Sequence, residues 1–301
     1  MDIQAGTLYI VGTPIGNLED MTFRAIQVLQ SVNLIAAEDT RHTGKLLKHF
    51  QIATPQISYH EHNRRGRIPE MIQRLGSGEA IALVTDAGMP GISDPGEDLV
   101  AACCQENIPI VPIPGPTAGI AALSVSGLAT ERFVFEGFLP PKGTERRDRL
   151  TQLETESRTI LLYESPHRLR KTLTDLANHL GGDRPIVLAR ELTKLHETVW
   201  RGSMEVAISY YANHEPKGEF TLVVAGVSSR QGEWTEAAIK AELVRQFQQG
   251  HSRSQASREL AAVTQLSRRM IYQLALTLPE SSEASPSVTN QPLIDQQMDE
   301  S

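Results

Sequence analysis

A loop dense in glycine and proline is the segment of this sequence best suited to bind a ligand. Residues 85–96 contain three glycines and two prolines, directly after an apolar run. Glycine leaves main-chain amides and carbonyls unobstructed, so a ligand can be held through main-chain hydrogen bonds. A plain long turn is the alternative, although such a turn does not need so many of these residues. We therefore interpret residues 85–96 as a binding loop.

Residues 11–17 and 112–118 form two further loops of this kind. The first contains Gly12, Pro14 and Gly16. It lacks the third glycine of the dinucleotide-binding fingerprint and the Gly-Lys-Ser/Thr end of a P-loop, so alone it is interpreted as structural. The second is a proline-rich turn that enters a helix, whose N-terminal amides are free and carry partial positive charge. It is compatible with both a hinge and the wall of a binding site.

The loops lie within an alternation of apolar runs and segments of helical periodicity. The first part of the chain predicts strands over residues 7–11, 32–37, 80–85 and 108–113. It predicts helices over residues 22–30, 42–50, 68–75 and 97–106, with residues 61–67 as a polar loop. This alternation indicates βαβ units and a mostly parallel sheet, which binds ligands outside the carboxyl ends of its strands.

A second alternation follows the prolines near residue 114. We predict strands over residues 133–135, 159–163, 186–189, 198–200 and 220–224, and helices over residues 117–126, 145–153 and 169–180. The fold class is therefore α/β, with an N-terminal α/β domain over residues 1–114 and a second over 115–227. Residues 228–278 predict a helical extension that resembles a helix-turn-helix, with helices over 234–248 and within 251–278. Residues 279–301 are acidic, and we expect them to be disordered.

Composition limits the classes of protein and the partners. The chain has 301 residues, 40% hydrophobic and 22% charged, which excludes fibrous and wholly disordered proteins. Its net charge is −7, of which the tail supplies −5, so a basic coat is excluded but a local basic patch is not.

The adjacent Cys103 and Cys104 rule out a disulfide scaffold and fit a cytoplasmic protein; we interpret them as core packing. No apolar run is long enough to span a membrane, and His42, His60 and His62 lack a further ligand for a metal site.

The three loops, in this order, resemble the tetrapyrrole methylase superfamily of S-adenosylmethionine-dependent methyltransferases. Together with residues 38–41 and 163–168, they are similar to one branch, the ribosomal RNA small subunit methyltransferase I family. The resemblance covers residues 7 to about 226 and weakens in the C-terminal helices. It implies two α/β domains with the cofactor in the cleft between them, a homodimer, and methylation of the ribose 2′-hydroxyl of a cytidine in the decoding region of 16S ribosomal RNA, with the small ribosomal subunit as partner.

The resemblance also implies a cofactor site for S-adenosylmethionine. Its residues would be Gly12, Pro14, Asp86, Ala87, Gly88, Met89, Pro90, Ile92, Ser93, Asp94, Thr117, Ala118, Tyr163, Ala189, Arg190, Glu191, Leu192, Gly218, Glu219 and Phe220. One departure bears on the substrate. Tetrapyrrole-modifying members typically carry Gly-x-Gly-Pro-Gly-Asp in the first loop, where this chain has Pro14 and Asn17 in place of the second glycine and the aspartate. This favours the RNA branch.

Methyl transfer to a hydroxyl requires alignment and a proton acceptor. The candidate carboxylates at strand and loop ends are Glu38, Asp39, Asp94, Glu164 and Glu191. For any single one of them, a role as a salt-bridge or capping partner is the more common explanation. Our choice for the catalytic group is Glu38 or Asp39.

RNA phosphates require positive charge. The candidate RNA-binding residues are Arg41, Arg64, Arg65, Arg67, Lys142, Arg146, Arg147 and Arg168, together with the neighbouring Arg149, Arg170 and Lys171. A solvated helix face is the alternative for each cluster. Two other functions stay open from the sequence: methylation of a tetrapyrrole precursor, and a non-catalytic RNA-binding assembly factor.

Overall fold

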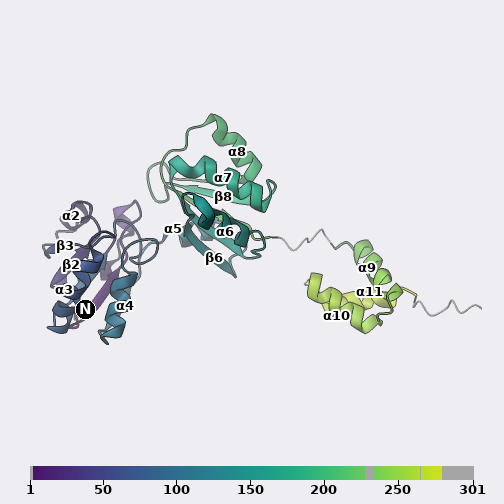
Figure 1. Ribbon diagram of the computed structural model, residues 1–301, viewed down its shortest axis with the longest axis horizontal. Coiled ribbons are helices and arrows are strands. Elements are labelled where there is room, and N and C mark those ends of the chain that lie inside the picture. The colour runs from purple at the N-terminus through teal and green to yellow at the C-terminus, as the bar shows by residue number, and fades with distance from the viewer. Residues whose placement is uncertain (1–2, 228–233, 265, 280–301) are drawn as a thin grey trace, which may run out of the picture. The chain divides into compact units, whose positions relative to one another are not determined.

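The computed structural model describes residues 3–227, 234–264 and 266–279. Residues 1–227 form one compact unit, and the chain after Val227 forms a second. The first unit contains both sheets (Figure 1). The division of that unit into domains at residue 114 therefore stays a prediction.

The first sheet is parallel throughout, as the alternation predicts. Its order is β3-β2-β4-β1-β5. The strands are β1 (Leu8–Val11), β2 (Leu34–Ala37), β3 (Gln56–Ser58), β4 (Ile81–Val84) and β5 (Ile110–Ile113). Every residue of β1, β2 and β4 is buried, which is typical of a parallel sheet covered on both faces.

Helices cover both faces of this sheet. They are α1 (Phe23–Ser31), α2 (Thr40–His49), α3 (Arg64–Gly76) and α4 (Glu97–Gln105), with a short 3-10 turn, η1 (Leu18–Asp20). Successive strand residues point to opposite faces, so Tyr9 and Val11 pack with α1 and α2 while Leu8 and Ile10 pack with α3 and α4. Cys103 belongs to the second of these cores, but Cys104 is exposed, so core packing explains only one of the two cysteines.

Two predictions in this region are wrong. Residues 61–67 are not all loop, because α3 already begins at Arg64. Its first turn is polar because it is largely exposed, and the apolar periodicity starts only at Ile68. The sequence analysis also missed β3, a three-residue edge strand whose residues are only half-buried and give no strong apolar signal.

The second sheet is mixed. Its order is β6-β7-β10-β8-β9, with only β6 and β7 parallel. The strands are β6 (Phe133–Phe138), β7 (Thr159–Glu164), β8 (Pro185–Arg190), β9 (Thr198–Ser203) and β10 (Phe220–Val224). The β8–β9 connection is residues 191–197, too short for the helical crossover that a parallel pair requires.

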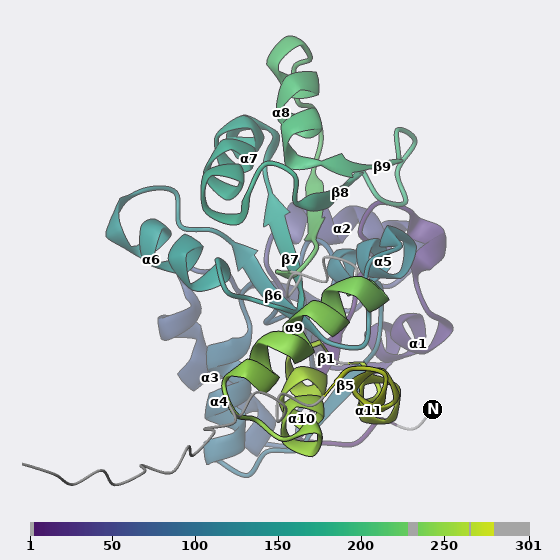
Figure 2. The same ribbon diagram turned by 90° about the vertical axis from the view of Figure 1, so that its right-hand side faces the viewer.

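Helices also cover both faces of the second sheet. They are α5 (Ala118–Ser126) on one face, and α6 (Gly143–Leu153), α7 (Pro166–Leu180) and α8 (Met204–Asn213) on the other. Figure 2 shows α7 beside α8, and α5 on the opposite side of the strands. The sequence analysis did not predict α8.

The second unit contains the three helices expected there: α9 (Glu236–Gln248), α10 (Arg253–Thr264) and α11 (Arg268–Leu276). They share an apolar core that includes Ile239, Leu260 and Ile271. The acidic tail predicted over 279–301 lies, beyond Pro279, outside the described residues. Among the helices that the structure describes, none is both long and apolar enough to cross a bilayer.

The three glycine- and proline-rich loops meet at the carboxyl edge of the first sheet. Thr13 and Gly88 exchange main-chain hydrogen bonds of 3.0 and 3.1 Å, and the Thr13 hydroxyl donates to the Thr85 carbonyl at 3.0 Å. Gly12 and Gly115 approach so closely that a Cβ on Gly115 would lie 2.8 Å from the Gly12 Cα. Glycine is therefore required at this contact for steric reasons, and the contact joins the first and third loops.

Gly115→Ala tests this contact. The added methyl group meets main chain that cannot move aside, so we expect a loss of about 1–3 kcal/mol in the free energy of unfolding, measured by urea denaturation. The matched control is Gly66→Ala in α3, where a Cβ meets nothing within 4 Å. There we expect a gain of up to about 1 kcal/mol, from the higher helix propensity of alanine. Equal effects of the two substitutions would contradict the steric argument.

Candidate active site

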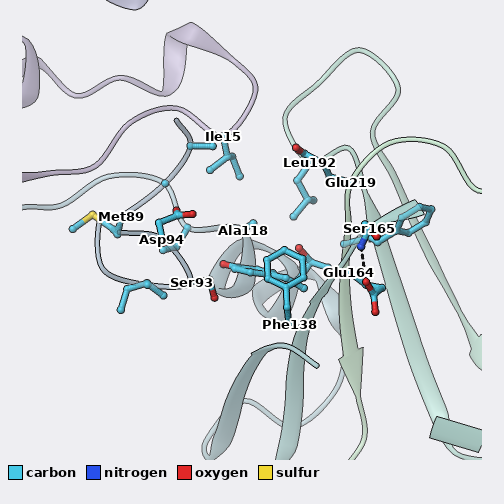
Figure 3. Close-up of a pocket in the computed structure, with 18 of the residues that line it drawn as sticks. Ile15, Met89, Ser93, Asp94, Ala118, Phe138, Glu164, Ser165, Leu192 and Glu219 are labelled. Carbon is cyan, nitrogen blue, oxygen red and sulfur yellow. Dashed lines mark hydrogen bonds between the residues drawn. The ribbon is translucent and has the colours of Figure 1, made fainter. Parts of the chain in front are cut away.

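A cavity of about 330 Å³ lies between the loop after β4 and the second sheet. Figure 3 shows Met89, Ser93 and Asp94 from that loop on one side, and Phe138 from β6 and Glu219, the residue directly before β10, on the other. The cavity falls within the size range of small-molecule sites. It lies at the carboxyl edge of the parallel sheet, where ligands of open α/β folds bind.

Many of the predicted cofactor residues line this cavity: Ala87, Gly88, Met89, Ile92, Ser93, Asp94, Thr117, Ala118, Tyr163, Ala189, Leu192, Glu219 and Phe220. Those that do not are Gly12, Pro14, Asp86, Pro90, Arg190, Glu191 and Gly218. Several of them instead position the lining. Gly12 packs on Gly115, and Glu191 accepts the Glu219 main-chain N–H at 2.9 Å.

Six lining residues are absent from the predicted cofactor set: Ile15, Phe138, Glu164, Ser165, Pro166 and Thr221. Of these, Glu164 is instead one of the candidate carboxylates. Phe138 belongs to the end of β6, beyond the predicted strand, and follows an irregularity in the pairing at Gly137. Ser165 and Pro166 form the turn into α7, within a segment that the resemblance had already marked. The remaining three, Ile15, Glu164 and Thr221, each directly follow a residue of the predicted cofactor set.

The lining is acidic. Among the described residues it contains three carboxyl groups, of Asp94, Glu164 and Glu219, and no lysine, arginine or histidine. Apolar and aromatic side chains, including Met89, Phe138 and Leu192, form much of the rest. Such a site favours a ligand that carries positive charge beside an apolar or aromatic group.

Glu164 is held within the protein. Its side chain is 1% exposed, accepts the Thr172 hydroxyl at 2.5 Å and the Ser165 N–H at 2.8 Å, and pairs with Arg168 at 3.3 Å. The same Thr172 hydroxyl accepts from Arg146, which pairs with Asp175 at 2.8 Å. Glu164 therefore fixes the turn between β7 and α7, with its acceptor positions already used.

The environment of Asp94 favours the protonated form of its carboxyl group. Burial, and then the negative charges of Glu38 and Asp86, raise the pKa of Asp94 to about 7. A carboxyl with this pKa exchanges protons near neutral pH, and it faces the cavity (Figure 3). It is thus suited to accept a proton from a bound hydroxyl.

Glu38 and Asp39, our choices from the sequence, do not line the cavity. The Asp39 carboxylate caps α2 by accepting the Arg41 N–H at 2.8 Å, and it pairs with the Arg41 guanidinium at 2.7 Å. These contacts hold the pKa of Asp39 well below its ordinary value. Glu38 accepts the Asp86 N–H at 3.2 Å, and burial raises its pKa. Asp39 therefore stabilises a helix terminus, and Glu38 acts on the site through its charge.

The predicted RNA-binding residues differ in their surroundings. Several are paired with carboxylates: Arg41 with Asp39, Arg64 with Glu61 and Asp98, Arg67 with Glu70, and Arg168 with Glu164. Arg65 is exposed, and Lys142, Arg146 and Arg147 line a second cavity. Arg146 is itself buried and bonded to protein groups, which removes it from any freely exposed basic face. The described residues contain no group of three or more possible metal ligands.

Comparison with known proteins agrees with this geometry. Residues 7–207 match the family described as Tetrapyrrole (Corrin/Porphyrin) Methylases. A ribosomal RNA small subunit methyltransferase I from Synechocystis sp. is 59% identical over 91% of this chain and 98% of its own length. Proteins of the same name from Streptococcus pyogenes and Halalkalibacterium halodurans are 47% and 45% identical, each over 89% of this chain and 94% of its own length.

Solved structures show the same fold at low identity. A uroporphyrin-III-C-methyltransferase from Thermus thermophilus has a TM-score of 0.54 and 22% identity, covering 76% of this chain and 98% of its own. A cobalt-precorrin-4 methyltransferase of cobalamin biosynthesis has a TM-score of 0.53 and 17% identity, covering 73% of this chain and 95% of its own.

The raised pKa of Asp94 predicts a pH-dependent effect of Asp94→Asn on stability. The ordinary pKa is 3.8, so between about pH 4 and 7 the unfolded chain releases this proton while the folded protein keeps it. Asp94 therefore costs increasing stability as the pH rises to about 7. We expect Asp94→Asn to raise the melting temperature by a few degrees at about pH 8, and by clearly less at about pH 5. The same change at both values would contradict the raised pKa.

Proposed function

Because the chain belongs to the ribosomal RNA small subunit methyltransferase I family of the tetrapyrrole methylases, we propose that it transfers a methyl group from S-adenosylmethionine to small-subunit ribosomal RNA. The observation that carries the proposal is the acidic cavity between the glycine-rich loop after β4 and the second sheet. Its lining suits a positively charged donor.

The cavity fits S-adenosylmethionine by the chemistry of its lining. Residues 87–89 and 92–94 offer main-chain groups and the Asp94 carboxyl on one side. Leu192, Phe138 and Phe220 offer apolar surface for an adenine ring on the other. When bound, the cofactor supplies an electrophilic methyl group on a positively charged sulfonium. The Asp94 carboxyl, which has no ion-pair partner among the described residues, would compensate that charge when ionised, and the apolar walls would exclude water from it.

Two sets of contacts hold the second-sheet side of the cavity in place. Tyr163 accepts the Gly119 N–H at 3.2 Å and contacts Phe135 and Phe138 edge to face, with ring centroids 5.1 and 5.7 Å apart. Glu219 pairs with Lys194, which also pairs with Glu191 at 3.2 Å. Rigid walls matter because methyl transfer is an in-line displacement whose rate depends on alignment.

We assign the proton acceptor to Asp94 rather than to Glu38 or Asp39. A ribose hydroxyl is a weak acid, so its proton must leave as the new O–C bond forms. Asp94 faces the cavity and has a pKa near neutrality, whereas the Asp39 carboxylate is bound by Arg41. Glu38 and Asp86 assist by raising the proton affinity of Asp94.

The finer identity of the substrate follows the family resemblance. We propose the ribose 2′-hydroxyl of a cytidine in the decoding region of 16S ribosomal RNA, within the small ribosomal subunit. The first loop supports the RNA branch, because Pro14 and Asn17 replace residues typical of the tetrapyrrole-modifying members. A homodimer and a cytoplasmic location remain predictions; light scattering of the purified chain tests the first.

Transfer of a labelled methyl group tests the proposed function. The protein is incubated with tritiated S-adenosylmethionine and either small ribosomal subunits that lack the modification or uroporphyrinogen. We expect label only in the ribosomal RNA, at one nucleotide that mass mapping identifies as a 2′-O-methylcytidine. Label only in the porphyrinogen would overturn the proposal, and so would the absence of S-adenosylmethionine binding in calorimetry.

The pH dependence of methyl transfer tests the assignment of Asp94. The rate should rise with pH as Asp94 ionises, and Asp94→Asn should lower it by about 10²–10⁴. Glu38→Gln removes a charge that raises the pKa of Asp94, so activity should persist to lower pH. We expect the ratio of the rate at about pH 6 to that at about pH 8 to rise roughly two- to fivefold.

Glu97→Gln is the matched control for Glu38→Gln. Glu97 is an exposed carboxylate at the start of α4, and it does not contribute to the pKa shift of Asp94. Its pH profile should match that of the wild type. A profile of Glu38→Gln that is unchanged, or displaced to higher pH, would contradict the assignment.

A further inference from the structure

A second cavity, of about 350 Å³, lies between the start of α6 and the outer side of α7. Its lining is basic, in contrast to the first cavity. Lys142, Arg146, Arg147 and Lys171 contribute positive charge, and Asp175 is its one carboxylate among the described residues. We name this site the basic pocket; Gly143, Thr144, Leu150 and His179 complete its lining.

The charges of the basic pocket do not cancel. Asp175 pairs with Arg146, whose guanidinium also donates to the Pro140 carbonyl at 2.9 Å and to Thr172 at 3.0 Å. This buried pair is internally compensated and holds the loop before α6 against α7. Lys142, Arg147 and Lys171 remain without a carboxylate partner among the described residues.

The three remaining cations are available to a ligand. Lys142 makes no ion pair or hydrogen bond within the described part of the chain. With respect to the residues that the structure describes, Arg147 donates only to Thr144, at 3.4 Å, and Lys171 only to the Pro141 carbonyl, at 3.1 Å. Their side chains keep further N–H donors. By contrast, Arg64 and Arg67 of the other predicted basic cluster are already paired with carboxylates.

The main chain adds to this positive field. Lys142 is the N-cap of α6, an 11-residue helix, and its side chain provides no cap hydrogen bond. The first-turn amides of α6 therefore lack a side-chain acceptor, and the helix places partial positive charge beside Gly143 and Thr144, which line the pocket. Three cations and free helix amides around one concavity are suited to a phosphate group.

The basic pocket lies close to the methyl-transfer site along two elements. Pro166 lines the first cavity and Lys171 the second, and five residues of helix span about 8 Å. Phe138 and Lys142 likewise line one cavity each and are four residues apart, at most about 14 Å. A single RNA strand could therefore contact both.

Resting on the proposed function, we propose that the basic pocket binds a phosphodiester group of the RNA substrate and anchors the strand whose ribose enters the acidic cavity. The acidic cavity repels phosphate, so the affinity for RNA must come from elsewhere on the surface. The basic pocket supplies that attraction with preformed geometry, because the Arg146–Asp175 pair fixes its walls.

A double variant and a matched control test this proposal. Lys142→Ala with Arg147→Ala removes one lysine and one arginine from the pocket, both exposed. Lys45→Ala with Arg132→Ala removes the same charges from exposed positions outside it. Affinity for small ribosomal subunits lacking the modification is measured at several salt concentrations. Affinity for S-adenosylmethionine and the turnover number are measured in parallel, and melting temperatures show that all variants fold.

We expect the pocket variant to bind the subunits roughly tenfold or more weakly, and its salt dependence to flatten by about one to two in log–log slope. The turnover number at saturating RNA and the affinity for S-adenosylmethionine should not change. The control should bind nearly as the wild type does. Unchanged RNA affinity in the pocket variant, or an equal loss in both variants, would overturn the proposal.

Two further outcomes distinguish RNA anchoring from the binding of small anions and from a failure of methyl transfer itself. Micromolar binding of ATP or inorganic phosphate by the wild type that the pocket variant loses, with RNA affinity unchanged, would make the basic pocket a site for small anions and overturn the proposal. Failure of the wild type to methylate RNA would overturn the proposed function. That result is obtained from the wild type alone, whereas the anchoring role is judged from the difference between the two variants.

Discussion

The approach of Gly12 to Gly115 determines where the candidate active site can form. A Cβ on either residue would lie within 3 Å of the other's main chain, so the loops after β1 and β5 can meet only because neither carries a side chain there. The Thr13–Gly88 bridge then joins the loop after β4 to the same point. With these loops joined, residues 87–89 and 92–94 line the cavity opposite residues of the second sheet.

This constraint explains how the glycine-rich loop after β4 is suited to hold a ligand through main-chain groups rather than through ion-paired side chains. Its main-chain groups are fixed before binding, which lowers the entropic cost of ordering them. It also explains the acidity. Asp94 lies in a partly buried corner with Glu38 and Asp86, where burial, and then the charges of these two residues, raise its pKa. Such an arrangement destabilises the folded protein and is expected where a positive ligand or a proton transfer compensates.

The sequence allowed the α/β class, most strands and the cavity residues of the loop after β4 to be predicted, because apolar runs and glycine spacing are local signals. It did not allow β3 or α8 to be predicted, since their stability depends on tertiary packing rather than strong periodicity. The same reason explains Phe138. Its position depends on how β6 continues past the irregular pairing at Gly137, which only the neighbouring strand determines. The antiparallel direction of β9 relative to β8 likewise depends on how the two strands pair, which the periodicity of either strand alone does not show.

The carboxylates show the limit most clearly. Asp39 and Asp94 are the same residue type and both follow a strand of the parallel sheet, yet Asp39 is bound by Arg41 two residues away, whereas Asp94 is affected by Glu38 and Asp86, which are not its neighbours in the sequence. The first contact is visible in the sequence as an Asp-x-Arg spacing at a helix start, where a cap is expected. The second depends on β2 lying beside β4, which brings Glu38 to Asp86. Strand order therefore adds to the effect of burial on the pKa of Asp94, and this part of the shift is not visible in local sequence.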